Sequence, residues 1–316
     1  MKRRALALML ATAGWVAGDP AAAQNGPASG PVIASNDNST PAGRLENGVL
    51  TLRLEARGGW WYPEGPAGDA YPIAAFAEQG GPLQNPGPTI RVPLGTKVRV
   101  TVRNTLFSPL RVFGLRGPRP IASDSVIIAP NVTAELEFTA SQPGTYFYAG
   151  RTDTSERGLF GRRGEDSQLN GVIIVDAPEA PRRSNERVFV LSWWLPDTLV
   201  AATAQLSSVF VINGLSWPHT ERFDVTQGDS LYWRWISVTV ANHPMHLHGF
   251  YFRVDAKGTP VRDTIYEPGQ RRMAVTEVLG PGQTMAMAWS PERPGNWLMH
   301  CHFANHVTPG GIDPEE

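Results

Sequence analysis

Six of the seven histidines lie in two short motifs, HPMHLH at 243–248 and HCHFANH at 300–306, and the second motif contains the only cysteine. The remaining histidine, His219, stands alone. A single histidine is usually an ordinary core or surface residue, but six in two motifs beside one cysteine are hard to attribute to chance. Imidazole nitrogen and thiolate sulfur are ligands that bind transition metals well. The two motifs therefore predict a metal site.

Strand alternation divides these residues into two groups, because successive side chains of a strand point to opposite faces. Cys301 points one way and its two neighbours the other. His306 lies past the end of this strand and His243 precedes a proline, so both can turn to the cysteine side. The opposite side then carries four histidines: His246, His248, His300 and His302.

A thiolate with two imidazoles is the ligand set of a blue-copper electron-transfer site. Zinc can use the same ligands, although structural zinc sites usually have more thiolates in a closed tetrahedron. A catalytic cysteine with a histidine base is a third possibility, but such a nucleophile needs one histidine rather than six. A disulfide within the chain is excluded because Cys301 is the only cysteine.

The sequence predicts that short β-strands position these residues. Alternating segments such as VLTLRLEARG, beginning at Val49, are separated by turn residues, and the chain has 32 glycines and 28 prolines. We find no long amphipathic helix, so we predict an all-β protein built from β-sandwiches. VPLGTKVRVTVRN and VTQGDSLYWRWIS look like copies of one another. They indicate two similar domains at 48–178 and 185–316, joined by a proline-rich segment.

Composition and the N-terminus limit the partners and the compartment. A formal net charge of −1, with no long basic run beyond the first residues, argues against nucleic acid as a partner. Residues 1–23 combine a basic start, a short apolar run and an Ala-rich cleavage site, which is typical of a signal peptide. Residues 24–47 read as a flexible leader. With no other stretch long enough to span a membrane, we expect a periplasmic or extracellular protein.

The sequence resembles the multicopper oxidases, a laccase-like family built from cupredoxin domains. HPMHLHG and HCHFANH match its copper motifs in residue type and spacing, and PGTYFYAG and INGLSWP resemble other parts of it. The resemblance implies two cupredoxin-like Greek-key β-sandwich domains with copper as cofactor. It also implies oxidation of a small reductant, a phenol or a metal ion, with O2 as the electron acceptor.

The resemblance also assigns the copper ligands. It implies type 1 copper at His243, Cys301 and His306. His246 matches the type 2 position, and the type 3 positions are His248, His300 and His302. Two tryptophans, Trp217 and Trp297, could line the copper pocket, although packing is the better interpretation.

The first half lacks the ligands that this resemblance leads us to expect. The family's first domain normally supplies two His-x-His pairs, and here the matching positions are Arg111 and Phe113, then Ala149 and Arg151. A three-copper cluster would keep only half of its imidazoles. Since residues two apart in a strand share a face, we predict that these four positions face the histidines, within one chain or between subunits.

The C-terminal segment departs from the family as well. The axial methionine would fall near Gly311, and 307–316 is too short and too rich in glycine and proline to supply the last strand. The alternative function is therefore a mononuclear type 1 copper protein that transfers electrons or binds copper without oxidase activity. A two-domain copper nitrite reductase fits less well, because its cysteine motif lies in the first domain. A homotrimer or a partner chain could complete the assembly.

Overall fold

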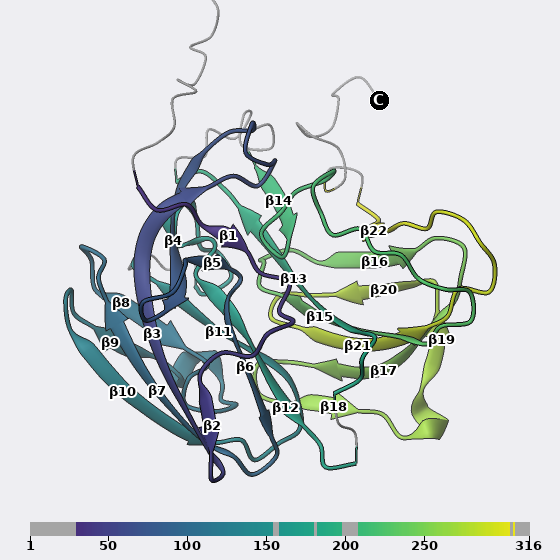
Figure 1. Ribbon diagram of the computed structural model, residues 1–316, viewed down its shortest axis with the longest axis horizontal. Helices are drawn as coiled ribbons and strands as arrows, with labels where there is room; N and C mark the ends of the chain where they lie inside the picture. Colours follow the sequence, from purple (N-terminus) through teal and green to yellow (C-terminus); the bar gives the residue numbers. More distant parts are fainter. Residues whose placement is uncertain (1–29, 154–157, 180–181, 198–207, 304–305, 307–316) are drawn as a thin grey trace, which may run out of the picture.

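The structure is a computed structural model that describes residues 30–153, 158–179, 182–197, 208–303 and 306. Four β-sheets account for nearly all of its regular structure, so the all-β prediction is confirmed (Figure 1). In the described part of the chain the helical segments are three short 3₁₀ turns, at Ile121–Ser123, Gly164–Asp166 and Pro268–Gln270. Within the same part, no helix has the length and apolarity required to cross a membrane.

Two facing sheets form the first half. The first has the order β1-β5-β4-β3-β7-β10, with β2 also paired to β3. Its strands are β1 (Ala34–Ser35), β2 (Arg44–Glu46), β3 (Val49–Trp61), β4 (Tyr71–Glu78), β5 (Gln84–Asn85), β7 (Lys97–Asn104) and β10 (Thr133–Thr139). The second has the order β6-β12-β11-β8-β9. Its strands are β6 (Gly87–Pro93), β8 (Leu110–Phe113), β9 (Val126–Ile128), β11 (Gly144–Arg151) and β12 (Asn170–Asp176).

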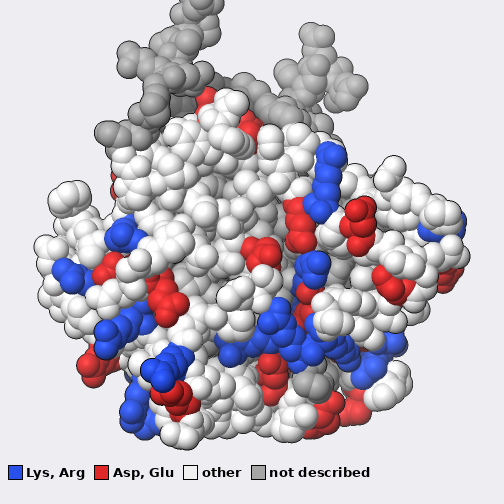
Figure 2. Space-filling view, in the orientation of Figure 1, with Lys and Arg blue, Asp and Glu red and all other residues white. Residues whose placement is uncertain are grey.

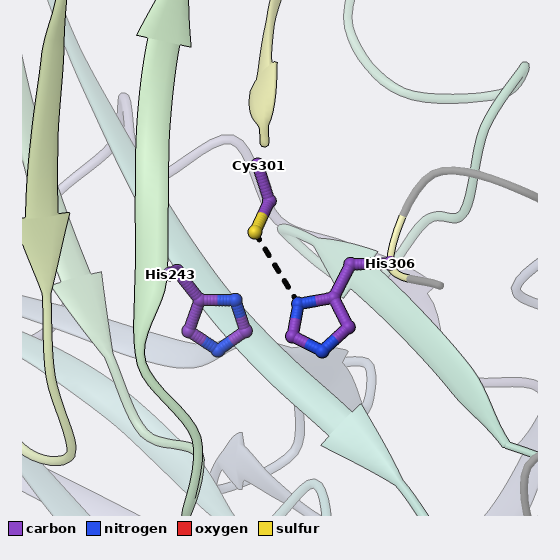
Figure 3. A group of neighbouring side chains, drawn as sticks. All are labelled: His243, Cys301 and His306. Atoms are coloured by element: carbon purple, nitrogen blue, oxygen red, sulfur yellow. Dashed lines mark hydrogen bonds between the residues drawn. The ribbon is translucent and has the colours of Figure 1, made fainter. Parts of the chain in front are cut away.

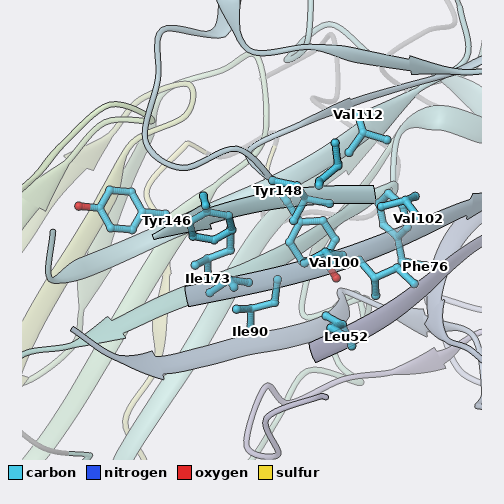
Figure 4. Close-up of a cluster of buried hydrophobic side chains, with 14 of the residues drawn as sticks. Leu52, Phe76, Ile90, Val100, Val102, Val112, Tyr146, Tyr148 and Ile173 are labelled. Atoms are coloured by element: carbon cyan, nitrogen blue, oxygen red, sulfur yellow. The ribbon is translucent and has the colours of Figure 1, made fainter. Parts of the chain in front are cut away.

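Alternation along β3 creates the core between these two sheets. Leu50, Leu52 and Leu54 are at most 2% exposed, whereas Thr51 and Arg53 between them are exposed. The buried leucines pack in one cluster with side chains of the opposite sheet, drawn in part in Figure 4. Each such burial contributes roughly 1.5–3 kcal/mol, so the alternating pattern alone explains why this strand adopts one register.

The second half repeats the arrangement with sheets of unequal size. The larger has the order β14-β13-β15-β21-β17-β18, with β19 on β17, and the smaller has the order β20-β16-β22. The larger contains β13 (Glu186–Trp194), β14 (Val209–Ile212), β15 (Leu231–Ser237), β17 (Phe252–Gly258), β18 (Asp263–Ile265), β19 (Arg272–Ala274) and β21 (Thr284–Trp289). The smaller contains β16 (His243–Leu247), β20 (Thr276–Leu279) and β22 (Met299–Cys301).

An apolar layer joins the two halves. Val188 and Val190 of β13 and Ile236 of β15 belong to one buried cluster with Phe147 and Val172 of the first half. These residues point out of their own sandwiches, because β11 and β12 turn their other face to the core of the first half. The outward faces are therefore covered by the opposite half rather than by water.

A buried ion network also crosses between the halves. Arg91 of β6 makes two bonds of 2.7 and 2.8 Å to Asp176 and also pairs with Glu186. The Nε of Arg234 in β15 lies 2.5 Å from the same glutamate. Although burial opposes ionisation of Glu186, the two arginines outweigh it and hold the pKa of this carboxyl below its usual value. On the face in Figure 2, basic and acidic side chains likewise lie beside one another in the lower centre.

The described part of the predicted leader is packed rather than flexible. Ile33 and Asn38 are each 4% exposed, and β1 pairs with β5. Asn38 donates from Nδ2 to the Asn213 side chain at 3.1 Å and accepts from Thr89 at 2.9 Å. The prediction of a flexible leader is therefore wrong for residues 30–47, because their amides bond buried groups of both halves. The predicted signal peptide, 1–23, and the missing last strand, 307–316, lie outside the described residues.

Candidate metal centre

The two histidine motifs form adjacent antiparallel strands. β16 and β22 pair so that Met245 stands opposite Cys301 and His246 opposite His300. One face of this small sheet packs on the core of the second half, and Met245, Leu247 and Cys301 are at most 8% exposed there. The other face is turned away from the core. The alternation read from the sequence thus separates the cysteine from its flanking histidines.

Three ligand atoms converge on the inner side of this sheet (Figure 3). One ligand atom each from His243, Cys301 and His306 lies within 4.8 Å of the others. The Cys301 Sγ is 3.3 Å from the His306 Nδ1. His243 shares the inner face of β16 with Met245 by alternation, and His306 lies past the end of β22 and turns back to the same side. This grouping is the one that the spacing predicts.

The environment keeps both imidazoles neutral. Burial, with a smaller contribution from His306, lowers the pKa of His243 to about 3, and burial lowers the pKa of His306 to about 4. Burial also raises the pKa of the Cys301 thiol. The His243 Nε2 lies 2.6 Å from the Thr239 hydroxyl, which leaves its Nδ1 for a metal. These unprotonated nitrogens and one thiol suit a soft transition metal that displaces the thiol proton.

An aromatic pair packs against His306. The Phe210 ring in β14 lies against His306, with ring centroids 3.9 Å apart. Trp193 in β13 stacks on Phe210 at 4.5 Å and 17°. Sequence reasoning missed both residues. Alternation within their two aromatic-rich strands is visible in the sequence. It does not show that Trp193 lies opposite Phe210, which only the strand pairing reveals.

A pocket of about 370 Å³ opens beside the three ligands. His243, Cys301 and His306 line it, together with apolar side chains that include Phe210 and Leu298. Trp217 lines it and is 50% exposed, whereas Trp297 packs against Phe250 at 4.7 Å between ring centroids. Of the two tryptophans considered from the sequence, only Trp217 therefore lies at the pocket.

The other four histidines form a second group on the outer face of β16 and β22. The Nε2 atoms of His248 and His300 are 2.9 Å apart. His246 lies 5.0 Å from both His248 and His302 between ring centroids. His248 and His302 are exposed, and the other two are partly buried.

The four first-half positions lie together but not at the histidines. Ala149 pairs with Phe113 and Arg151 with Arg111, so all four share one face of their sheet. Phe113 and Ala149 are buried in the apolar layer between the halves, and Arg151 pairs with Asp153. For Phe113 and Ala149 the prediction that these positions face the histidines is wrong within one chain, because both pack with side chains of β13 and β15 instead.

Comparisons with known proteins agree with this fold. The solved structure called Multicopper Oxidase mgLAC superposes with a TM-score of 0.65 at 22% identity, over 84% of this chain and 83% of that one. Cupredoxin-like sandwiches of this kind define the fold class. Two multicopper oxidase sequence profiles match residues 83–177 and 192–311, which together exceed half of the chain. The chain therefore belongs to the multicopper oxidase family, whose cofactor is copper.

Two curated relatives show how far the similarity extends. Laccase-3 of Arabidopsis thaliana is 37% identical over 78 residues, which are 22% of this chain and 13% of that protein. A probable nitrite reductase-hydroxylamine oxidoreductase fusion protein of Kuenenia stuttgartiensis is 26% identical over 239 residues, 71% of this chain and 26% of that protein. The chain thus spans only a small part of the length of these relatives.

Proposed function

We propose that this protein is a copper-dependent oxidoreductase that takes single electrons from a small reductant at a type 1 copper. The observation that supports this most strongly is the convergence of His243, Cys301 and His306 within 4.8 Å. The donor set fits the metal, since it offers one sulfur and two neutral imidazoles on the inner side of the three-stranded sheet. When bound there, copper supplies a one-electron redox couple.

The residues around the ligands have separate roles in this proposal. Thr239 orients His243 through its bond to Nε2. Phe210 and Trp193 keep water from one side of His306. Cys301 is covalently joined to His300 and His302, so the chain itself provides a short path for electrons from the thiolate to the outer face.

The pocket beside the ligands is the docking place that we propose for the reductant. It borders Cys301 and His306, and the described residues that line it include no Asp, Glu, Lys or Arg. An apolar lining favours a neutral aromatic molecule such as a phenol over a metal ion, whose hydration shell needs charged or polar replacements.

We do not expect this chain alone to reduce O2. A three-copper cluster does not fit, because the first-half positions that match its other imidazoles in the sequence are Arg111, Phe113, Ala149 and Arg151, none of which is a histidine. Forming a homotrimer cannot supply the missing imidazoles, since every copy lacks them. O2 would become the acceptor only with a partner chain. Otherwise the protein passes electrons to another acceptor.

We also propose a periplasmic or extracellular location. The support is the basic, apolar and Ala-rich character of residues 1–23, which matches a cleavable export signal.

The test is anaerobic mixing of the copper-loaded protein with hydroquinone, and separately with Fe²⁺, while the blue colour is followed. We expect hydroquinone to bleach the colour faster than Fe²⁺, with about one electron taken up per chain. Oxygen is then admitted, and its uptake should be slow. Failure of both reductants to bleach the colour would contradict the proposed oxidation, and rapid O2 uptake would contradict the missing cluster.

A further inference from the structure

A cation stands at the mouth of the pocket beside the three ligands. The described residues that line this pocket include no charged side chain, and Trp217 among them is 50% exposed. The guanidinium carbon of Arg222 lies over the Trp217 ring, 5.4 Å from its centroid. A positive charge is therefore placed at the opening of the pocket, whereas the interior is apolar.

The charge of Arg222 is not neutralised by an ion pair within the described part of the chain. The neighbouring carboxylate, Glu221, is paired with Arg187 instead, at 3.0 Å between Glu221 Oε1 and Arg187 Nε. Arg222 is exposed, and the contact that it makes is with the Trp217 ring. Its N–H groups therefore remain available to hydrogen-bond a ligand at the mouth.

Contacts with the first half fix the turn that carries Trp217. The Trp61 Nε1 donates to the Gly214 carbonyl at 2.7 Å, and the Ser216 amide donates to the Pro63 carbonyl at 2.9 Å. The aromatic wall of the pocket is thus tied to the opposite half of the molecule. A wall held in place in advance loses little conformational freedom when a flat ring packs against it.

The position of Arg222 distinguishes it from an ordinary surface arginine. Arginines often lie over aromatic rings on protein surfaces, and Arg183 does so here, 3.7 Å from the centroid of the Tyr232 ring. Tyr232, however, is not among the residues that line the pocket, whereas Trp217 lines it together with Cys301. Of these two stacked arginines, only Arg222 can act on a molecule that enters beside the copper ligands.

We infer that the reductant is a phenol that carries a carboxylate, with its ring in the pocket and its carboxylate at Arg222. This inference rests on the proposed function and narrows its substrate class. A guanidinium can donate two parallel hydrogen bonds to a carboxylate. The carboxylate stays at the mouth, where it keeps part of its hydration, and the apolar interior receives only the ring. The reductant gives one electron to the copper and one phenolic proton to water at the open mouth.

Anaerobic bleaching by 2,5-dihydroxyphenylacetate and by its methyl ester tests this inference. A methylene group separates the carboxylate from the ring, so the two molecules give up electrons with similar ease. We expect the acid to bleach the blue colour about two- to fivefold faster than the ester when both are dilute, which is what one exposed ion pair contributes. Added salt should reduce the difference, because exposed charges are screened.

Two variants locate the source of this preference. Arg222→Gln should bleach at equal rates with the acid and the ester. The matched control is Arg183→Gln, which removes the other stacked arginine and should keep the preference of the wild type. A measurement of binding alone uses redox-inert phenylacetate and phenylacetamide, of which phenylacetate should slow bleaching by hydroquinone more strongly in the wild type but not in Arg222→Gln.

Three results would overturn the inference. They are equal rates for acid and ester in the wild type, a preference that survives Arg222→Gln, and a preference that Arg183→Gln abolishes as well, which would mean that overall charge rather than position decides. In each of these cases hydroquinone would still bleach the colour. Failure of the proposed oxidation is therefore distinguishable, because then no reductant bleaches it.

Discussion

Cys301 and His243 are buried and His306 is partly buried, and the three groups carry one proton that a metal would displace, that of the thiol. The thiol is 8% exposed, and burial raises its pKa. His243 and His306 are neutral at physiological pH because burial lowers their pKa values to about 3 and about 4. Copper binding must therefore release the thiol proton but no imidazole proton. The same burial makes the copper-free protein sensitive to acid.

Copper-free protein should lose stability as the pH falls below the ordinary histidine pKa. The unfolded chain binds a proton at His243 near pH 6.5, whereas the folded chain resists until about pH 3. Stability therefore falls through this window, and His243 alone should lower the free energy of unfolding by about 2 kcal/mol between pH 7 and pH 5. Urea unfolding of chelator-treated protein at several pH values measures it.

The variant His243→Gln provides the comparison for this prediction. Glutamine keeps a polar group near Thr239 but does not titrate, so the variant should show a shallower loss between pH 7 and pH 5. Equal slopes for wild type and variant would mean that His243 is not buried in its neutral form.

At the scale of elements, the pairing of β16 with β22 holds the site together. Met245 stands directly opposite Cys301 and is fully buried in the core of the second half. This strand pair therefore transmits core packing to the ligands. The side chains on the opposite face of β16 do not pack in this core, since Pro244 and His246 are partly exposed.

Met245→Ala should destabilise the protein by about 2–5 kcal/mol, because it leaves a cavity under the strand that carries Cys301. Copper affinity should fall with it. Val278→Ala is the control: Val278 is 48% exposed on neighbouring β20, so the change should stay within about 0.5 kcal/mol. Chemical denaturation of both variants measures the difference. A loss at Met245 no larger than at Val278 would contradict this view of the strand pair.

The sequence predicted this element well and others poorly, for physical reasons. Alternation has period two, so one cysteine between two histidines determines which side chains share a face. It says nothing of what covers a face, and Phe113 and Ala149 were therefore matched to the wrong neighbours. The polar composition of residues 30–47 predicted a flexible leader, and this failed for a related reason. Asn38 is buried because Asn213 and Thr89 bond its amide, and such partners are visible only in the fold.

At the scale of the whole molecule, a polar and an apolar contact fix one half against the other. Glu186 is 6% exposed at its side chain and pairs with Arg91 of the first half and Arg234 of the second. The apolar layer around Val190 and Phe147 is another part of the contact. Each contact supports a separate prediction.

Glu186→Gln should destabilise the protein by about 3 kcal/mol, because it leaves two arginines facing a neutral amide in a buried place. The value is near the lower end for such losses because Arg91 keeps Asp176. Glu221→Gln removes a more exposed pair with Arg187, and should cost at most about 1 kcal/mol. Thermal unfolding of the two variants side by side decides whether the buried network matters more than the surface pair.

Placing histidine at all four first-half positions should not create a copper cluster. Arg111, Phe113, Ala149 and Arg151 share one face, and Phe113 and Ala149 on it pack on the second half's larger sheet. The histidines of the outer face lie on the smaller sheet. We expect no gain in bound copper, and a loss of stability because a ring at Ala149 overfills a closed site. Elemental analysis of the folded variant measures this. A gain of two or more coppers per chain would show that the two faces meet.

The central claim is that His243, Cys301 and His306 bind a type 1 copper, and absorbance during a Cu²⁺ titration tests it most directly. A copper–thiolate bond in this ligand set gives an intense visible charge-transfer band. The band should grow until about one copper per chain is bound at this site, and Cys301→Ser should abolish it. A copper-loaded wild type without the band, or a Cys301→Ser variant that keeps it, would contradict the assignment.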